Sequence, residues 1–123
     1  MFTHASAIDA IKSAFPSLRI ELEDVTWCGL LHPEIGCFAR FTQQCIDHED
    51  QKEASRCFGL ADQIFSGCDA AVKNAMYVSY LEHLNFTDGK KKRAWAFEKL
   101  PPRLKQGFID INRHLEDISQ KKG

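Results

Sequence analysis

The sequence predicts an all-α fold, an irregular antiparallel bundle of about five to six helices that forms a single domain over residues 1–123. Three observations predict this class. Only 4 prolines and 7 glycines occur in 123 residues, and they lie between segments with helical periodicity. Strict alternation of apolar and polar residues, which is typical of strands, is nearly confined to residues 18–23. The predicted loops are about two to six residues long, so neighbouring helices should run antiparallel.

Two short helical segments are expected first. Ser6 followed by Asp9 resembles a capping box, and Pro16 ends the segment that these residues begin. The apolar residues of this first helix recur at helical spacing: Ile8, Ile11 and Phe15. A second helical segment, beginning at Ser17, would place three side chains on one face: Leu18, Leu22 and Val25.

Two longer amphipathic helices are expected next. His32, Pro33 and Glu34 indicate a helix start, because proline suits the first helical position and an acid suits the first turn. The apolar stripe of this helix is Ile35, Phe38, Ala39, Cys45 and Ile46. Asp50 with Glu53 is a second start signal. The stripe that follows it is Cys57, Leu60, Ala61, Ile64, Phe65 and Cys68.

Three further segments complete the expected bundle. Residues 70–86 are apolar around most of a helical circumference, which predicts one continuous central helix of roughly 25 Å. A turn at residues 87–89 separates it from a short helix with Arg93, Trp95, Phe97 and Leu100. Pro101 and Pro102 end that helix and start the last one. The seam of the last helix is Leu104, Phe108, Ile111, Leu115 and Ile118.

The formal net charge of −1 conceals an uneven distribution. Residues 1–88 contain 6 Lys+Arg and 13 Asp+Glu, a sum of −7, whereas residues 89–123 contain 10 and 4, a sum of +6. A nucleic-acid-binding protein usually carries a clear excess of basic residues, so we do not expect this chain to bind nucleic acid as a whole. The sequence instead predicts an acidic body with a basic C-terminal third.

The cysteines and histidines form no recognisable site. The five cysteines include no CxxC pair, which fits neither a disulfide framework nor a zinc site, so reduced thiols that pack in the core are expected. The five histidines include no HxxxH or HExxH motif. Neither a signal peptide nor an apolar run of membrane-spanning length occurs. We therefore expect a cytoplasmic protein with no metal, cofactor or membrane span.

Three stretches carry a resemblance to a known family: Thr26–His32 (TWCGLLH), Gly36–Gln43 (GCFARFTQ) and Asn74–Leu84 (NAMYVSYLEHL). In these words the chain resembles a family of small, uncharacterised, all-helical bacterial domains, over about residues 17–115. The resemblance implies a helical fold and supplies no catalytic residue. Single-domain helical proteins of this kind are often immunity proteins encoded beside secreted bacterial toxins, an analogy of size and setting.

The absence of any catalytic motif favours binding over chemistry. We expect a non-enzymatic protein-binding domain, an immunity protein that neutralises a nuclease-type toxin. The acidic body would complement the basic cleft in which a nuclease binds phosphates. The expected contact residues are acidic groups, with a tyrosine as an anchor where it is exposed: Glu21, Glu23, Asp24, Asp47, Glu49 and Asp50, with Tyr77 or Tyr80.

An alternative follows from the polar residues in the segment 70–86. Polar groups on a largely apolar helix must find partners or face a cleft. The chain would then be a small-molecule-binding or enzymatic helical domain with a pocket along the central helix. The residues expected to line that pocket are Trp27, Asn74, Tyr77, Glu82 and His83. The sequence leaves the oligomeric state open.

Overall fold

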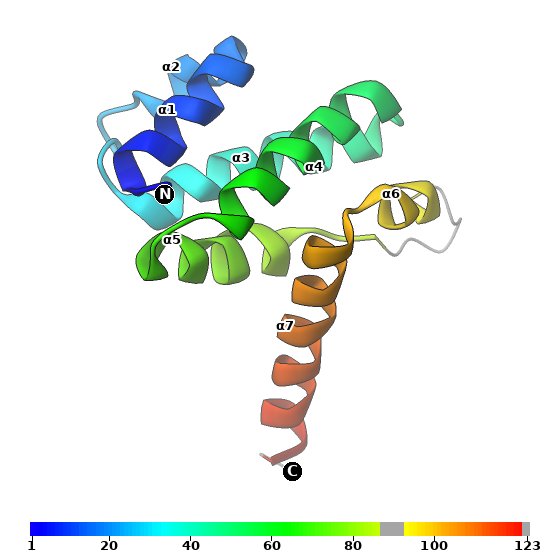
Figure 1. Ribbon diagram of the computed structural model, residues 1–123. Helices are drawn as coiled ribbons and strands as arrows, with labels where there is room; N and C mark the ends of the chain where they lie inside the picture. Colours follow the sequence, from blue (N-terminus) through cyan, green and yellow to red (C-terminus); the bar gives the residue numbers. More distant parts are fainter. Residues whose placement is uncertain (87–92, 122–123) are drawn as a thin grey trace.

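The computed structural model describes residues 1–86 and 93–121, with side chains described as far as residue 113. Over these residues the fold is all-α, as the sequence predicts, with seven α-helices (Figure 1). The elements are α1 (His4–Ala14), the 3₁₀ turn η1 (Pro16–Leu18), α2 (Arg19–Leu22), α3 (Leu31–Asp47), α4 (Gln51–Ser66), α5 (Ala70–Ala75), the π-helical turn η2 (Met76–Tyr80), the 3₁₀ turn η3 (Leu81–His83), α6 (Ala94–Lys99) and α7 (Pro102–Lys121). The turn expected at residues 87–89 and the side chains of Leu115 and Ile118 lie outside the described part.

The N-terminal helices differ from the prediction in their boundaries. Thr3, not Ser6, is the N-cap of α1, and Thr3 and Ser6 form a reciprocal capping box. The helical segment after α1 ends at Leu22, because residues 24–29 form turns instead of a further helical turn. Val25 was expected on the apolar face with Leu18 and Leu22, and this was wrong: Val25 is 96% exposed.

The long helix α3 buries the stripe that the sequence predicts, and α4 buries four of its six predicted residues, while Leu60 and Cys68 are partly buried and Cys68 lies beyond the helix end. All five stripe residues of α3 are buried, and Asp50 caps α4 by accepting a hydrogen bond from the Glu53 amide at 3.1 Å. Leu31 is the first residue of α3, so Pro33 is the third residue and not the first. Proline is tolerated there because the first four amides of a helix have no intrahelical partner.

The segment 70–86 is not one continuous helix. It consists of α5, η2 and η3 in succession and becomes extended at Leu84. Three consecutive side chains, Ser79 to Leu81, are buried at the junction of η2 and η3. A regular α-helix turns by about 100° per residue and would spread three such side chains over more than half of its circumference. The wider π-helical turn accommodates their burial on one side.

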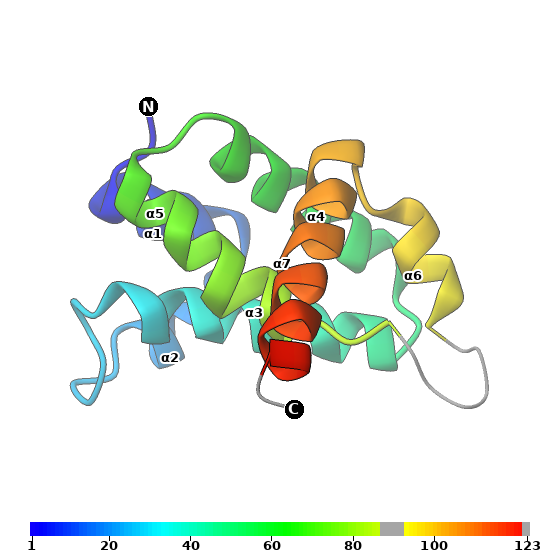
Figure 2. The same ribbon diagram turned by 90° about the horizontal axis from the view of Figure 1, so that it is seen from below.

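The middle of the molecule is formed by α3 and the segment 70–83, which pack against each other. Figure 1 shows α3 and α4 crossing the molecule together, with α1 on one side, and Figure 2 shows the same arrangement from below. The first half of α7 packs on η3 and α4, while its second half extends away from the other helices (Figure 1). Gly107 lies at this contact: a Cβ there would be 2.9 Å from Leu81 Cδ1.

The N-terminus is attached to the turn between α4 and α5. Phe2 donates its amide to the Gly67 carbonyl at 2.7 Å and accepts a hydrogen bond from the Asp69 amide at 3.0 Å. Phe2 and Cys68 form an isolated parallel bridge, the single β-type pairing among the described residues. No helix in residues 1–86 or 93–121 combines the length and apolar character that crossing a membrane requires.

Candidate functional site

The first group of predicted acidic contact residues lies around α2, and each of its members has a partner. Glu21 forms an ion pair with Arg40 of α3. Glu23 lies 3.4 Å from the Lys12 ammonium. Asp24 accepts a hydrogen bond from the Thr26 amide at 2.8 Å, which lowers the pKa of its carboxyl group. These acids therefore stabilise the connection between α1, α2 and α3.

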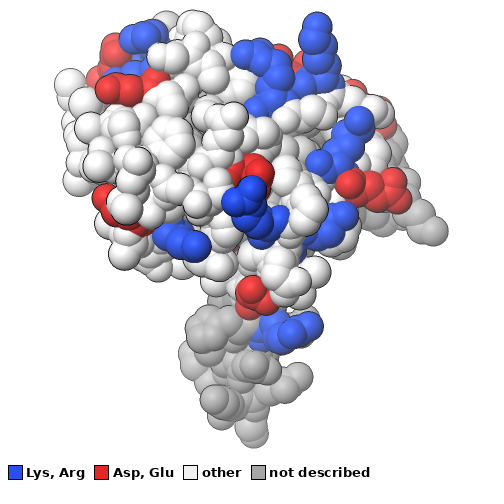
Figure 3. Space-filling model, viewed as in Figure 1, with Lys and Arg blue, Asp and Glu red and all other residues white. Residues whose placement is uncertain are grey.

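The second group lies at the turn between α3 and α4. Asp47 accepts a hydrogen bond from Arg93 at 2.9 Å, and Asp50 is the N-cap of α4. Glu49 adopts a positive φ of 56° in the same turn. Figure 3, which views the molecule from the same side as Figure 1, shows acidic and basic side chains interspersed on that face. The structure thus separates the predicted acids into two groups with mainly structural contacts.

The two predicted tyrosine anchors are not alike. Tyr80 is fully buried, so the prediction that it contacts a partner was wrong. Its hydroxyl lies 3.0 Å from Thr42 Oγ1, its ring stacks on Phe38, and burial raises its pKa well above the ordinary value. Tyr77 is half-buried, with its ring at an edge-to-face distance of 5.1 Å from Phe65.

The structure brings together only two of the residues expected along the central helix. Asn74 is exposed on α5, and Trp27 is half-buried with its indole N–H donating to the Glu21 carbonyl at 2.6 Å. Neither residue lines a cavity with the others. Glu82 and His83, at the end of η3, are exposed and line the largest cavity described. The predicted pocket along the whole segment is therefore not formed, and two of its five expected residues line a cavity at the end of the segment.

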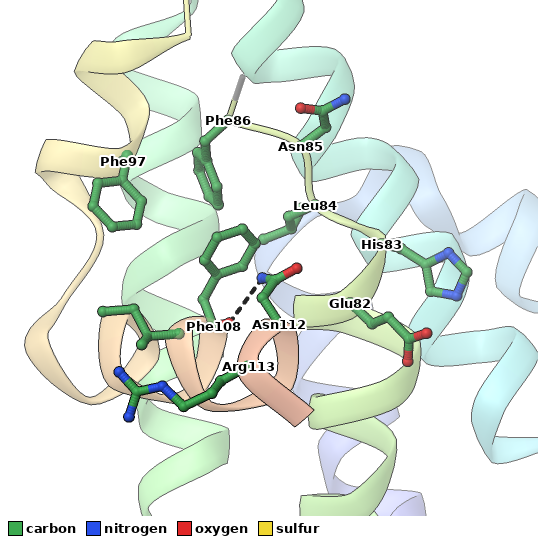
Figure 4. Close-up of a pocket in the computed structure, with 10 residues that line it drawn as sticks. Glu82, His83, Leu84, Asn85, Phe86, Phe97, Phe108, Asn112 and Arg113 are labelled. Atoms are coloured by element: carbon green, nitrogen blue, oxygen red, sulfur yellow. Dashed lines mark hydrogen bonds between the residues drawn. The ribbon is translucent and has the colours of Figure 1, made fainter. Parts of the chain in front are cut away.

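That cavity, the aromatic groove, has a volume of about 790 Å³ and lies between residues 82–86, α6 and α7. Its floor consists of Phe86, Phe97 and Phe108, whose rings point toward one another in Figure 4. The centroid of Phe86 is 5.6 Å from that of Phe97 and 5.0 Å from that of Phe108, both in edge-to-face geometry. Its polar rim includes Glu82 and Arg113.

A second, smaller cavity lies on the other side of His83. This polar cavity has a volume of about 370 Å³ between α3 and the segment η2–η3. His32 Nδ1 lies 2.7 Å from Ser79 Oγ across it, and Arg40 and His83 also line it. His83 is common to both cavities, and Figure 4 shows its ring turned away from the phenyl rings of the groove.

One protein family matches nearly the whole chain. Its description is "Domain of unknown function (DUF7674)", and the match covers residues 8–116. The chain belongs to this family. The resemblance to an uncharacterised all-helical family, inferred from the sequence, is confirmed. Neither a curated protein nor a solved structure matches the chain.

The cysteines of this DUF7674 domain are free thiols, and Cys37, Cys45 and Cys57 are buried. Burial raises the pKa of Cys37 to about 11, and it raises the pKa of Cys57 still further. These values correspond to packed, unreactive thiols. Among the described residues, no group of three or more His, Cys, Asp or Glu side chains is placed to hold a metal ion.

The sequence analysis missed several residues of both cavities in this DUF7674 chain. In the sequence, the three groove phenylalanines are interpreted as parts of apolar stripes or as the end of a helix. His32 is interpreted only as part of a helix start. Ser79 lies inside an apolar run and carries no motif. The one available signal was the polar pair Glu82–His83 at the end of that run, and it did point to the groove.

Proposed function

We propose that this domain is a non-enzymatic binding protein that holds a partner protein in the aromatic groove. The observation that carries the proposal is the composition of the groove: three converging phenylalanine rings form the floor, and charged side chains stand at the rim. Protein interfaces have this arrangement, with an apolar centre that supplies most of the binding free energy and a polar rim that excludes water. The occupant would be an apolar or aromatic side chain of the partner.

The partner that we propose is a bacterial toxin domain of the nuclease type, which the chain neutralises as an immunity protein. The charge of residues 1–88 supports a basic partner, since the sum of −7 already includes Lys12, Arg19 and Arg40, which pair with the acids around α2. These pairs leave this part of the chain with a net negative charge, which favours contact with a basic protein within a screening length of its surface. The size of the chain and its helical fold fit this class by analogy.

We also propose that the protein acts in the cytoplasm. The five free thiols support this location, because a reducing compartment preserves unpaired cysteines. An immunity protein of a bacterial cell would act in the same compartment as the nuclease that it neutralises.

The test is a binding measurement with the product of the neighbouring gene, which under this proposal is the toxin domain. The double variant Glu82→Lys with Arg113→Glu reverses both rim charges, and neither side chain forms an ion pair among the described residues. We expect it to weaken binding about tenfold or more in isothermal titration calorimetry. The matched control is Asp9→Lys with Lys52→Glu, two exposed residues on α1 and α4.

The outcomes separate clearly. Full binding by the control with weakened binding by the rim variant supports the groove as the contact. A parent protein that forms no complex with the toxin domain at micromolar concentration removes the proposed partner. A complex that both variants form equally well removes the groove as the contact surface.

A further inference from the structure

The polar cavity is built from two facing helical rows. His32, Gly36 and Arg40 follow one another at intervals of four on α3, so they share one face. Ser79 and His83 have the same spacing on the segment η2–η3 opposite. Gly36 leaves space between the rows, since its nearest side-chain neighbour would be Arg40 Nη1, 3.7 Å from an added Cβ. Chain segments far apart in sequence therefore converge on one hollow.

The contact between the rows bears on which ring nitrogen of His32 carries the proton. Ser79 is only 7% exposed, and its hydroxyl lies 2.7 Å from His32 Nδ1. The Ser79 hydroxyl can donate to Nδ1 or accept from an Nδ1–H, depending on the tautomer of His32. When Ser79 donates, the ring proton lies on Nε2, and the exposed side of the His32 ring offers an N–H donor.

Arg40 contributes the fixed positive charge of the cavity. Its Nη2 pairs with Glu21 and lies 3.2 Å from Cys37 Sγ, on the side away from Gly36. A guanidinium has five N–H groups in a rigid plane, so it can bind one carboxylate with one edge and a second anion with another. The side chain is further held against the Trp27 ring, 6.0 Å from its centroid.

Among the residues whose side chains are described, no carboxylate lines the polar cavity, and the amide side chain of Gln43 is already occupied. The Gln43 side chain donates to Asp47 Oδ1 at 3.0 Å and exchanges hydrogen bonds with the Asn85 backbone. The remaining polar groups are Arg40 and two imidazoles, all of which can donate. A hollow lined by donors and a positive charge favours an oxyanion.

We propose that the polar cavity is a small-molecule site that binds an oxyanion group, a carboxylate or a phosphate monoester. Arg40 supplies the charge, and the Nε2–H of His32 and the His83 ring supply further hydrogen bonds. The volume of about 370 Å³ is at the lower end of the range for small-molecule pockets, so the ligand is small. This site shares only His83 with the aromatic groove and goes beyond the proposed protein-binding function.

The experiment titrates the full chain with inorganic phosphate and, in a second arm, with acetate, followed by ¹H–¹⁵N NMR. We expect the amide and side-chain signals of Arg40, Ser79 and His83 to shift in a saturable way with at least one probe, and the two arms decide between phosphate and carboxylate. Sodium chloride at equal ionic strength is the blank. Unshifted signals in both arms, or equal shifts with chloride, would overturn the proposal.

Matched variants test the assignment of the residues. Arg40→Gln should weaken binding about tenfold or more, because it removes a charge-assisted hydrogen bond to the anion. Arg56→Gln is its control, since Arg56 is likewise an exposed arginine in an ion pair. His83→Gln is the second test and His48→Gln, an exposed histidine elsewhere on the chain, is the control. Equal affinities of the Arg40→Gln and Arg56→Gln proteins would contradict the site.

The role of Ser79 has a spectroscopic signature of its own. The ¹⁵N shifts of the His32 ring should show the Nε2–H tautomer in the parent protein and a mixture of tautomers in Ser79→Ala. A general loss of packing would alter many signals, whereas the loss of this contact should alter the tautomer of the His32 ring alone. Identical ring shifts in the two proteins would show that Ser79 does not orient His32.

Discussion

The contact between Glu34 and His4 joins α1 to α3 through one hydrogen bond. Glu34 is only 4% exposed, and its Oε1 lies 2.6 Å from His4 Nε2. A buried carboxylate is costly unless it is paired or hydrogen-bonded, so this contact offsets the desolvation of Glu34. The sequence predicts Glu34 only as a first-turn acid, because nothing in the sequence indicates that His4 lies beside it.

We expect His4→Ala to destabilise the protein by about 2 kcal/mol, since it leaves the Glu34 carboxyl group buried without its partner. His4→Gln keeps a donor and should recover part of this loss. The measurement is the free energy of unfolding in urea. In a protein that already carries Glu34→Gln, His4→Ala should lower the free energy of unfolding by less. An equal loss in both backgrounds would show that the two residues do not interact.

The thiols give a prediction for individual cysteines. Cys28 is the exposed cysteine, whereas burial raises the pKa values of the other four thiols. A raised pKa lowers the thiolate fraction at pH 8, and the thiolate is the reactive form. Native protein should therefore lose one thiol rapidly to iodoacetamide, and Cys28→Ser should abolish that phase. Rapid loss of several thiols in the folded protein would contradict the buried arrangement.

At the scale of the elements, start signals and apolar stripes predict most helices correctly. Asp50 and Pro102 mark observed helix starts, and the stripe of α3 and most of the stripe of α4 are buried. The segment 70–86 was predicted as one helix because apolar residues around most of the circumference mask any change of helical period. The π-helical turn depends on packing against α3, and that contact is not visible in a local pattern.

The contact of α7 with η3 has a matched pair of glycines for a test. Gly107→Ala places a Cβ 2.9 Å from Leu81 Cδ1 and 3.3 Å from Phe65 Cζ, so we expect a loss of about 1 to 3 kcal/mol of stability. Gly59→Ala in α4 has no atom within 4 Å and should stabilise the protein by about 0.5 to 1 kcal/mol. Thermal unfolding of both variants measures the difference. Equal effects would show that α7 does not pack closely at Gly107.

At the scale of the whole molecule, the basic C-terminal third is tied to the acidic body. Arg93 pairs with Asp47 at 2.9 Å, and Arg103 lies 3.6 Å from Asp62. The sums of −7 and +6 from the sequence therefore belong to regions that touch, at least through these pairs. Charge counts along a sequence predict that the two parts of the chain carry opposite net charge. Only the fold shows which oppositely charged side chains contact one another.

We expect association with the proposed basic partner to depend on salt. Raising the ionic strength from about 20 to about 500 mM shortens the screening length from about 20 Å to about 4 Å. The association rate constant should fall by about tenfold, while the dissociation rate constant changes little, because long-range attraction acts on the encounter. Stopped-flow measurements with the toxin domain test this. A salt-independent association rate would contradict a basic partner without excluding the groove.

The candidate sites were harder to predict than the fold. Glu82 and His83 could be identified because charged and polar groups stand out at the end of an apolar run. Ser79 and His32 are 47 positions apart, and the three groove phenylalanines come from residues 84–86, α6 and α7. Such sites arise from tertiary contacts between side chains that are individually ordinary, so no spacing rule reveals them.

The hydrogen bonds of Phe2 to Gly67 and Asp69 also bear on the order of folding. They close a loop that contains α1, α3 and α4, and closing a free chain of this length costs about 4 kcal/mol of entropy. Hydrogen bonds with a net contribution of about 1 kcal/mol each do not offset that cost alone. We therefore expect Phe2 to attach only after these helices have packed, and to detach first when the native state opens locally.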